Sequence, residues 1–430
     1  MNKFPFLILA ALLLAACTPS APVGTPTPVE APFTSAPPAS PASSEIPMLP
    51  GRPPGTELST AIEGPPMPGC TLQTLIRDAD EAETSLFPPV SESDWRSGPD
   101  TAVATIIEYA DFQCPFCAQL APTLTQLKAN YPDDVRVVFR HFPITSIHDK
   151  AGLAALAAEA AGVQGRFWEM HDLLFARQNE WAGMGFDTFR VWLTDRAVEL
   201  GLNVVEFSTD LENQALADRV QAAFDAAIKS AVPGTPFLLI NGRIYNGPTD
   251  YDNLSVIIRL YQLQERQYQS CPPLIIDPEF EYEATIVTEH GEIVLELYPA
   301  DAPLAVNNFV FLALDGYYDG ITFHRVFPGY IAQTGDPSGT GFGGSGYAFS
   351  REDNGLLFDT PGTVALDSEA NGSQFFLTYT PLPSLDGSYT IFGRVVDGLE
   401  VLNALSSRDP NDGVNQPPGD RILTILIEER

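Results

Sequence analysis

Two cysteines stand three positions apart in the first half of the chain, as Cys114-Pro115-Phe116-Cys117. A pair with this spacing can pass a disulfide to another protein, close a local structural disulfide, or supply half of a zinc site. Zinc is disfavoured, because the chain has a single C-x-x-C and no pair of His residues beside it. The spacing therefore indicates redox chemistry of sulfur, with a local structural disulfide as the alternative.

The elements around these cysteines decide which of them reacts. Residues 101–109 are rich in β-branched side chains and predict a buried strand, and a helix is expected from Pro115 to about Asn130. Cys114 would then lie at a helix N-terminus, where free amides and partial positive charge favour a thiolate. We expect Cys114 to be the attacking sulfur and Cys117 to be the resolving one.

The pattern that follows is a strand, a helical stretch and a second strand region. A strand is expected over 135–142, and Gly234-Thr235-Pro236 forms a turn that feeds another strand. Between them, apolar periodicity predicts helices over 149–161, 166–178, 186–200 and 205–231.

This order resembles the DsbA-type branch of the thioredoxin superfamily over about residues 91–268. The resemblance implies that Pro236 is a cis-proline facing the cysteines and that Thr235 pairs with bound substrate through its backbone. It also implies that Glu108 is a buried acid that assists proton transfer. Phe116 departs from strongly oxidising relatives, which have a His there, so the resemblance leaves oxidase, isomerase and reductase open.

The second half changes to a β pattern. Residues 284–288 and 293–298 alternate around His290-Gly291-Glu292, residues 302–314 predict a helix, and short strands between Gly and Pro turns follow. These features predict a closed barrel. Three long motifs lie in this half, at 323–336, 372–376 and 385–393.

The three motifs resemble a cyclophilin over about residues 281–430. Rotation of a prolyl amide meets a barrier of about 18–20 kcal/mol, and a catalyst needs an apolar slot and a cationic donor that favours the twisted amide. By resemblance, Arg325 is the donor and Gln333 holds it. The proline slot and its edge would be formed by Tyr330, Ile331, Phe376, Leu385, Gln374 and Tyr389.

Two details of this half qualify the resemblance. His324 is expected to be a packed structural residue rather than an acid or base. The loop 366–371 is short and acidic compared with the family, which implies altered recognition of the substrate strand. A barrel that binds without catalysis is the alternative.

The N-terminus predicts export. Lys3 is followed by an apolar run over 4–14 and by Leu14-Ala15-Ala16-Cys17, which resembles a bacterial lipobox. The resemblance implies that Cys17 is lipidated; a plain secretory peptide and an uncleaved anchor are the alternatives. No later stretch reaches the roughly 18 apolar residues of a membrane span.

The remaining cysteines, Cys70 and Cys271, flank the first domain. An export compartment permits disulfides, so we expect these two to form a structural bond, with two free thiols as the alternative. Between Thr18 and Gly69, 15 of 52 residues are Pro, which predicts an extended disordered spacer. A net charge of −32 argues against nucleic acid and against docking on anionic lipid.

A chain of 430 residues is long enough for two cores. The expected fold is multidomain, an α/β thioredoxin-like domain with a helical insertion followed by an all-β-dominated cyclophilin-like closed barrel. The expected parts are a lipoprotein signal (1–17), a Pro-rich disordered linker (18–69), an N-terminal extension (70–90), the DsbA-like domain (91–268), a connector (269–280) and the cyclophilin-like domain (281–430).

The functional hypothesis is a lipid-anchored extracytoplasmic folding factor, in the periplasm or at the cell surface, that combines prolyl isomerisation with thiol-disulfide exchange. Its partners would be unfolded or folding exported polypeptides and a membrane redox partner. The chain would be attached to the membrane by its lipid anchor alone. No cofactor or metal is expected. A non-catalytic holdase or scaffold, and a dedicated thiol reductase fused to an isomerase, remain alternatives.

Overall fold

The computed structural model describes residues 64–77, 79–368, 371–413 and 416–430. All of them fall within Ile46–Arg430, one of the two units into which the chain divides. The expected export signal, Cys17 and residues 18–63 of the Pro-rich tail lie outside the described residues. Within the described part of the chain, no helix is long and apolar enough to cross a bilayer.

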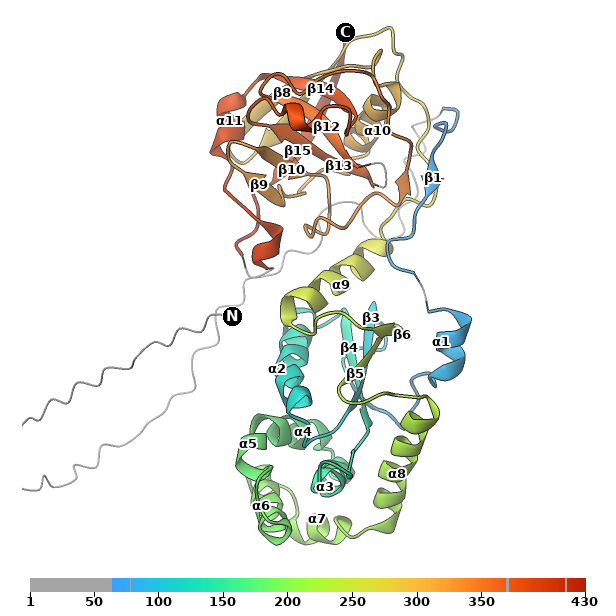
Figure 1. Cartoon of the computed structure of the whole chain (residues 1–430), viewed down its shortest axis with the longest axis vertical. Coiled ribbons are helices and arrows are strands. Elements are labelled where there is room, and N and C mark those ends of the chain that lie inside the picture. Colours follow the sequence, from blue (N-terminus) through green and yellow to red (C-terminus); the bar gives the residue numbers. More distant parts are fainter. Residues whose placement is uncertain (1–63, 78, 369–370, 414–415) are drawn as a thin grey trace, which may run out of the picture. The chain divides into compact units, whose positions relative to one another are not determined.

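A five-stranded sheet forms the centre of the N-terminal domain (Figure 1). Its order is β2-β4-β3-β5-β6, with β3 (Ala104–Ala110) and β4 (Val135–His141) parallel and the other pairs antiparallel. Every residue of β3 is buried, which explains why its sequence is almost continuously apolar rather than alternating. The edge strands are β2 (Trp95–Ser97) and β6 (Arg243–Tyr245), and β5 (Phe237–Ile240) lies between β3 and β6.

The helices of this domain fall into two groups. A short helix, α1 (Glu81–Leu86), precedes the sheet, while α2 (Pro115–Asn130) follows β3 and contacts α9 (Tyr251–Gln264). The helical insertion between β4 and β5 consists of α3 (Ala151–Val163), α4 (Phe167–Ala176), α5 (Gln178–Trp181), α6 (Phe186–Glu199), α7 (Val204–Asp210) and α8 (Gln214–Lys229).

One expected helix is divided in two. Apolar periodicity over 205–231 predicted a single helix, but α7 ends at Asp210 and α8 begins at Gln214. Asn213 explains the break, because its side chain accepts a hydrogen bond from the Ala215 amide and caps the start of α8. The helices α1 and α9 were not foreseen.

An eight-stranded sheet dominates the C-terminal domain, in the order β15-β7-β8-β14-β12-β13-β10-β9. The strands are β7 (Tyr282–Thr288), β8 (Gly291–Leu297), β9 (Arg325–Phe327), β10 (Ile331–Thr334), β12 (Thr363–Ser368), β13 (Asn371–Thr378), β14 (Ile391–Asp397) and β15 (Ile422–Glu429).

The prediction that this sheet closes into a barrel is wrong. The sheet curls, but within the described residues its end strands β9 and β15 do not pair with each other. The outer edge of β9 is used by a loop instead: the Val326 amide donates to the Arg408 carbonyl at 2.8 Å, and the Arg408 amide donates back at 2.9 Å. The curled sheet is therefore open, and its β9 edge is covered.

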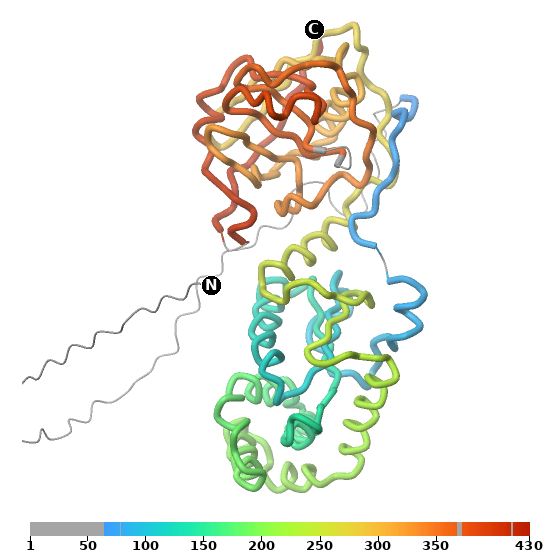
Figure 2. The backbone as a smooth tube through the Cα atoms, in the orientation of Figure 1, coloured from blue at the N-terminus to red at the C-terminus, as the bar shows by residue number. Residues whose placement is uncertain are grey.

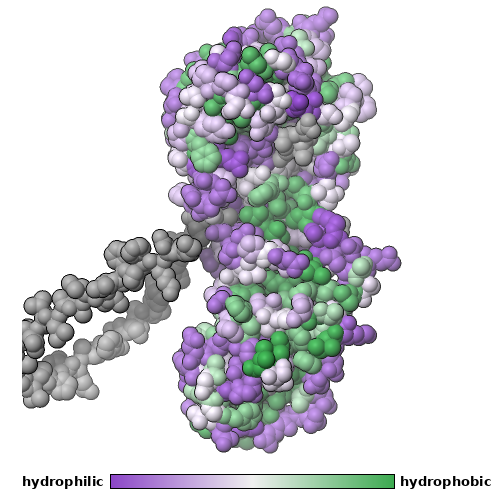
Figure 3. Space-filling model, in the orientation of Figure 1, coloured by the Kyte–Doolittle hydropathy of each residue, from purple (hydrophilic) through white to green (hydrophobic). Residues whose placement is uncertain are grey.

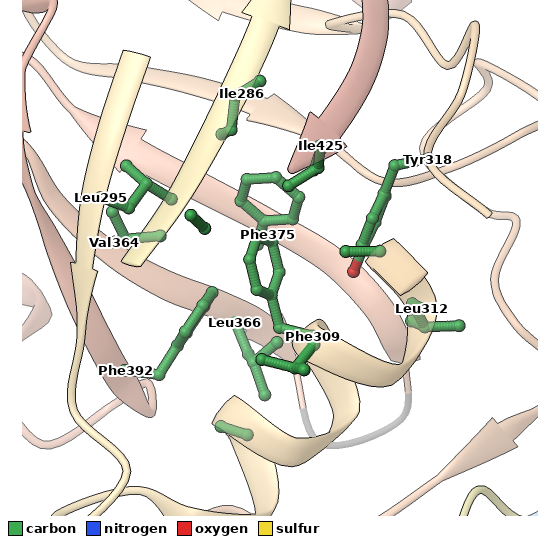
Figure 4. Close-up of a cluster of buried hydrophobic side chains, with 14 of the residues drawn as sticks. Ile286, Leu295, Phe309, Leu312, Tyr318, Val364, Leu366, Phe375, Phe392 and Ile425 are labelled. Carbon is green, nitrogen blue, oxygen red and sulfur yellow. The ribbon is translucent and has the colours of Figure 1, made fainter. Parts of the chain in front are cut away.

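The core of this domain is aromatic and lies between the sheet and α10 (Pro303–Leu314), which contacts β13 and β15. Figure 4 shows Phe309 of α10 beside Phe375 and Phe392. The ring centre of Phe309 lies 5.3 Å from the ring centres of both. Burial of each such side chain contributes about 1.5–3 kcal/mol, so this cluster holds the curl together.

Residues 64–72 precede the N-terminal domain in the sequence but pack with the C-terminal one. Met67 is buried in the same apolar cluster as Phe309. The strand β1 (Thr71–Leu72) pairs with β11 (Tyr347–Ala348), and Figure 2 shows this blue segment running beside the orange chain. The end of the expected spacer thus has an ordered place in the C-terminal domain.

Cys70 and Cys271 form a disulfide, with their sulfur atoms 2.05 Å apart and a sequence separation of 201 positions. Both pack against the core of the C-terminal domain. The bond closes a covalent loop that contains the whole N-terminal domain.

Removal of this cross-link by Cys70→Ser with Cys271→Ser should lower the free energy of unfolding of the C-terminal domain by about 2–5 kcal/mol, because the cross-link restricts the unfolded chain. Hydrogen exchange of peptides from β7, β8 and β15 in rising denaturant would measure it. Cys114→Ser with Cys117→Ser is the matched control, since it removes two sulfurs elsewhere. Equal protection in both double variants would contradict the prediction.

Candidate active sites

The dithiol site lies where β3 leads into α2. Cys114 is the N-cap residue of α2, with an extended backbone (φ −70°, ψ 122°), and Pro115 follows it in the first helical turn. Proline fits this position because the first amides of a helix have no partner within the helix. The Asp111 carboxylate holds the preceding loop, accepting hydrogen bonds from the Gln113 and Ile144 amides at 2.8 Å each.

Gln178 of α5 secures the same loop from the helical insertion. Its side-chain amide donates to the carbonyls of Phe112 and Cys114, at 2.8 and 2.9 Å. The sequence alone does not indicate this residue, since nothing in its local pattern separates it from an ordinary surface Gln. The insertion therefore fixes the backbone at the reactive cysteine.

The Cys114 sulfur faces the turn that contains Thr235. The thiol donates to the Thr235 carbonyl at 3.3 Å, and the Thr235–Pro236 peptide bond is cis, as the resemblance implied. Hydrogen bonds from the Cys117 thiol and from the amides of Cys117 and Phe116 stabilise the thiolate and lower the pKa of Cys114 to about 5. Cys114 is thus a thiolate at neutral pH.

The pKa values of Cys117 and Glu108 are raised, whereas that of Cys114 is lowered. Cys117 is fully buried, and burial, its hydrogen bond with Cys114 and the charge of Glu108 raise its pKa well above the usual value. Burial and the charge of Cys114 raise the pKa of Glu108 to about 8. Neither carboxyl oxygen of Glu108 has a hydrogen-bond partner among the described residues. Glu108 is therefore protonated at neutral pH.

The buried acid predicts a pH-dependent stability. In the unfolded chain a Glu carboxyl ionises near 4.5, but in the folded dithiol protein it keeps its proton to about pH 8. Glu108 therefore does not change the free energy of unfolding below pH 4.5. As the pH rises from 4.5 towards 8, Glu108 lowers that free energy, because the unfolded chain releases the proton that the folded protein keeps. We expect Glu108→Gln to stabilise the dithiol protein by about 2–4 kcal/mol at pH 8 and to have little effect at pH 4.

Denaturant unfolding of the reduced protein, followed by tryptophan fluorescence, measures this difference. Glu206→Gln is the control, because Glu206 is an exposed acid in α7 of the same domain. If the difference in free energy of unfolding between Glu108→Gln and the wild type were the same at pH 4 and pH 8, Glu108 would ionise normally.

Apolar surface surrounds the dithiol. Phe116, between the two cysteines, is 63% exposed, and Ile147, in the segment after β4 whose Ile144 amide donates to Asp111, is 70% exposed. A groove beside Cys114 runs along α2 and is lined by Pro115, Ala118, Pro122, Phe175 and Gln178, among others. On the face that Figure 3 shows, hydrophobic and hydrophilic residues are interspersed. These surfaces suit an extended, partly apolar peptide.

The second site is built across three neighbouring strands. Arg325 of β9 and Gln333 of β10 are register partners, and the guanidinium donates to the Gln333 side-chain oxygen at 2.8 Å. The Gln333 amide nitrogen donates to the Gln374 side-chain oxygen at 2.8 Å. Gln374 in turn donates to the carbonyls of Gly341 and Gly343. This chain of hydrogen bonds holds a half-buried cation in one orientation.

An apolar cluster accompanies the arginine site. It contains Ile331, Phe376 and Leu385, which were expected in the proline slot, and Tyr389, which was expected at its edge. It also contains Phe358, which the sequence did not indicate. The ring centres of Phe376 and Tyr389 lie 5.1 Å apart, and those of Phe376 and Phe358 lie 5.9 Å apart. Tyr330 was expected in the slot but is 41% exposed and is not part of the cluster.

His324 is fully buried beside Arg325 in the sequence. Burial lowers its pKa to about 4, so the imidazole is neutral at neutral pH. This agrees with the expected packing role, since isomerisation of a prolyl bond makes or breaks no covalent bond and transfers no proton.

The two halves of the chain match two different protein families. Residues 284–426 match the family described as cyclophilin type peptidyl-prolyl cis-trans isomerase, and residues 91–259 match a thioredoxin family. A peptidyl-prolyl cis-trans isomerase of Synechococcus elongatus is 43% identical over 149 residues, which are 34% of this chain and 95% of that protein.

Two further proteins match part of the chain. A Na(+)/H(+) antiporter NhaA 3 of Salinispora tropica is 41% identical over 181 residues. The matched region is 42% of this chain, and it spans only 26% of the length of the antiporter. The crystal structure of oxidised BdbD from Bacillus subtilis is 23% identical, with a TM-score of 0.37, over 41% of this chain and 97% of that one.

The chain thus has a thioredoxin-like domain with a dithiol at a helix N-terminus, followed by a second domain that matches an isomerase over nearly that protein's full length. It belongs to the cyclophilin-type peptidyl-prolyl cis-trans isomerases and carries a thioredoxin-family domain ahead of the isomerase-type domain.

Proposed function

We propose that the chain is an extracytoplasmic protein-folding factor with two activities, thiol-disulfide exchange at Cys114 and prolyl isomerisation at Arg325. The observation that carries this proposal is the presence in one chain of a low-pKa thiol against a cis-proline turn and a hydrogen-bonded arginine beside an apolar cluster. Disulfide formation and prolyl isomerisation are both slow steps in the folding of exported proteins.

The disulfide reaction uses the different pKa values of the two cysteines. In the oxidised protein a substrate thiolate attacks the Cys114 sulfur, the Cys114–Cys117 bond breaks, and Cys117 leaves with a proton from Glu108. A second substrate thiolate then attacks the substrate sulfur of the mixed disulfide and expels Cys114 as a thiolate. The substrate gains one disulfide and loses two electrons, which the protein receives as its dithiol. The pKa of about 5 makes Cys114 a good leaving group in this direction.

The isomerase reaction depends on a fixed charge. In the twisted amide the proline nitrogen is pyramidal and can accept a hydrogen bond, which the planar amide does not offer. Arg325, held by Gln333, donates that bond while the apolar cluster binds the proline ring. The donor stabilises the transition state more than the ground state, and so it lowers the barrier.

Location and partners follow from the sequence. The resemblance of residues 14–17 to a lipobox supports a lipid anchor at Cys17, and the disulfide between Cys70 and Cys271 suits an oxidising compartment. Unfolded or folding exported polypeptides are the proposed substrates, and a membrane oxidoreductase is the proposed source of oxidising equivalents. A net charge of −32 disfavours nucleic acid as a partner.

Two peptide assays on the wild-type chain test the proposal. The first measures by NMR exchange whether the chain speeds interconversion of cis and trans isomers in a blocked proline peptide. The second measures whether one equivalent of oxidised chain converts a dithiol peptide into its disulfide. Binding of both peptides without turnover would identify a holdase instead, and transfer only from peptide disulfide to the reduced chain would identify a reductase.

A further inference from the structure

A buried carboxylate begins the loop that follows β10, close to the arginine site. Asp336 lies two residues after the end of this strand, and its side chain is fully buried. Its two oxygens accept six hydrogen bonds from residues 338–343, at distances of 2.6–3.3 Å. The mechanism described above gives this carboxylate no role.

The hydrogen bonds fix the path of the loop backbone. Ser338 donates to the Oδ1 atom of Asp336, from its amide at 2.8 Å and from its hydroxyl at 2.6 Å. The Oδ2 atom accepts from the amides of Thr340, Gly341 and Gly343, at 3.0, 2.6 and 3.1 Å. A carboxylate suits this place because it only accepts hydrogen bonds, and every group that faces it here donates one.

The same loop holds Gln374 of β13 with its carbonyl groups. The side-chain nitrogen of Gln374 donates to the Gly341 oxygen at 3.1 Å and to the Gly343 oxygen at 2.8 Å. Gly341 has a left-handed backbone (φ +84°), in which its amide faces Asp336 while its carbonyl faces Gln374. At Gly343 an added β-carbon would collide with the Asp336 carboxylate. The loop is thus one backbone thick between the two side chains.

The orientation of Gln374 is passed on to the arginine. Because its nitrogen is bonded to two carbonyls, Gln374 presents its oxygen to the Gln333 amide group, at 2.8 Å. The Gln333 oxygen then accepts from the Arg325 guanidinium, also at 2.8 Å. An amide has one acceptor atom and one donor atom, so a reversal of either Gln would bring like groups together. Both Gln side chains are fully buried, so water does not readily replace a lost bond.

We propose that Asp336 is a positioning residue that aims Arg325 through the loop 336–343. The carboxylate fixes the loop, the loop carbonyls fix Gln374, and Gln374 fixes the amide group that holds the guanidinium. This inference rests on the proposed isomerase function. Without Asp336 the arginine stays on β9, but its guanidinium points at the twisted amide for a smaller fraction of the time.

Asp336→Asn is the variant that tests this role. Asn has the same shape, but one of its two end atoms is a donor, so at least one loop amide faces a nitrogen instead of an oxygen. We expect kcat per folded molecule to fall by about tenfold, less than for loss of Arg325 itself, with KM nearly unchanged. NMR exchange with the full chain and an uncharged blocked proline peptide measures both.

Ser338→Ala is the second variant if Asp336→Asn does not fold. It removes only the hydroxyl bond to the carboxylate and keeps the five others, one of them from the Thr340 hydroxyl at 3.3 Å. We expect kcat per folded molecule to fall by about two- to threefold, in line with the loss of one hydrogen bond. A wild-type kcat in every variant that folds would overturn the positioning role.

Two controls separate positioning from stability. Leu402→Ala removes a buried side chain of α11 (Leu399–Ala404), outside the loop, and should destabilise the same domain. Asp301→Asn makes the same chemical change as Asp336→Asn at an exposed position. Both controls should keep the wild-type kcat per folded molecule, which a loss of activity through instability alone would not allow Asp336→Asn to fall below.

A double-mutant cycle with Gln374→Ala tests the route from the loop to the arginine. If Asp336 acts through Gln374, Asp336→Asn should cost about tenfold in the wild type and almost nothing in Gln374→Ala, where the loop has no side chain to orient. The same factor in both backgrounds would overturn this route.

A last readout does not depend on turnover. The NMR signal of the Arg325 side-chain Nε–H group should move or broaden in Asp336→Asn and stay in place in Asp301→Asn. An unchanged signal in Asp336→Asn would overturn the inference even if the rate fell. A wild-type chain without isomerase activity would overturn the proposed function, while the Arg325 signal would still decide whether Asp336 fixes the guanidinium.

Discussion

Arg325→Ala is expected to lower kcat/KM for prolyl isomerisation by about 10²- to 10³-fold, the loss that follows removal of one fixed transition-state donor. The guanidinium is held at 2.8 Å from Gln333 and lies beside the cluster that would bind the proline ring. Since its hydrogen bond to the proline nitrogen forms only in the twisted amide, kcat should fall far more than KM changes. NMR exchange on a blocked proline peptide measures both.

Arg394→Ala is the matched control for this variant. Arg394 lies in β14 of the same domain, and its exposed side chain pairs with Glu296 at 2.7 Å. An exposed pair of this kind contributes little to stability, so the variant should fold and isomerise as the wild type does. If Arg325→Ala kept the wild-type rate, the C-terminal domain would bind proline segments by its apolar cluster alone, as a holdase does.

The second large effect is expected when either cysteine of the dithiol is replaced. The two variants should lose disulfide transfer at different steps. Cys114→Ser should reduce disulfide transfer to the uncatalysed background, because the attacking sulfur and its low pKa are lost. Cys117→Ser keeps the Cys114 thiolate but removes the sulfur that resolves the mixed disulfide. We therefore expect Cys117→Ser to accumulate a covalent adduct with a peptide disulfide, one peptide per chain, that non-reducing mass spectrometry detects.

The double variant Cys70→Ser with Cys271→Ser provides the control, since it removes two sulfurs and leaves Cys114 and Cys117 in place. It should transfer disulfides at the wild-type rate. A Cys117→Ser protein that formed no adduct, or a Cys114→Ser protein that formed one, would reverse the assigned roles of attacking and resolving cysteine.

Local signals predicted the dithiol half well. The helix α2 runs from Pro115 to Asn130 as expected, because a proline at its start and a run of good helix formers act within the element itself. The division between α7 and α8 was missed because a single capping side chain, Asn213, outweighs a continuous apolar pattern. Gln178 was missed because its partners are 64 and 66 residues away in the sequence.

Long-range pairing limited the prediction for the C-terminal half. Whether a curled sheet closes depends on what meets its end strands, and here Arg408 occupies the edge of β9 from a loop about 80 residues later. The motifs contain Arg325, Gln333 and several residues of the apolar cluster, but its aromatic member Phe358 comes from a segment with no such motif. The acidic loop was noticed in the sequence, but the lost register between β12 and β13 was not, because it depends on how two strands pair.

The bond between Cys70 and Cys271 gives the chain the topology of a ring with two tails. A protease that cuts the backbone once anywhere from residue 71 to residue 270 opens the ring but releases no fragment, because both pieces remain joined through the two sulfurs. Separation requires a second cut or reduction of that bond. A protein exposed to proteases outside the cytoplasm would thus survive a single nick with both reactive centres still on one covalent molecule.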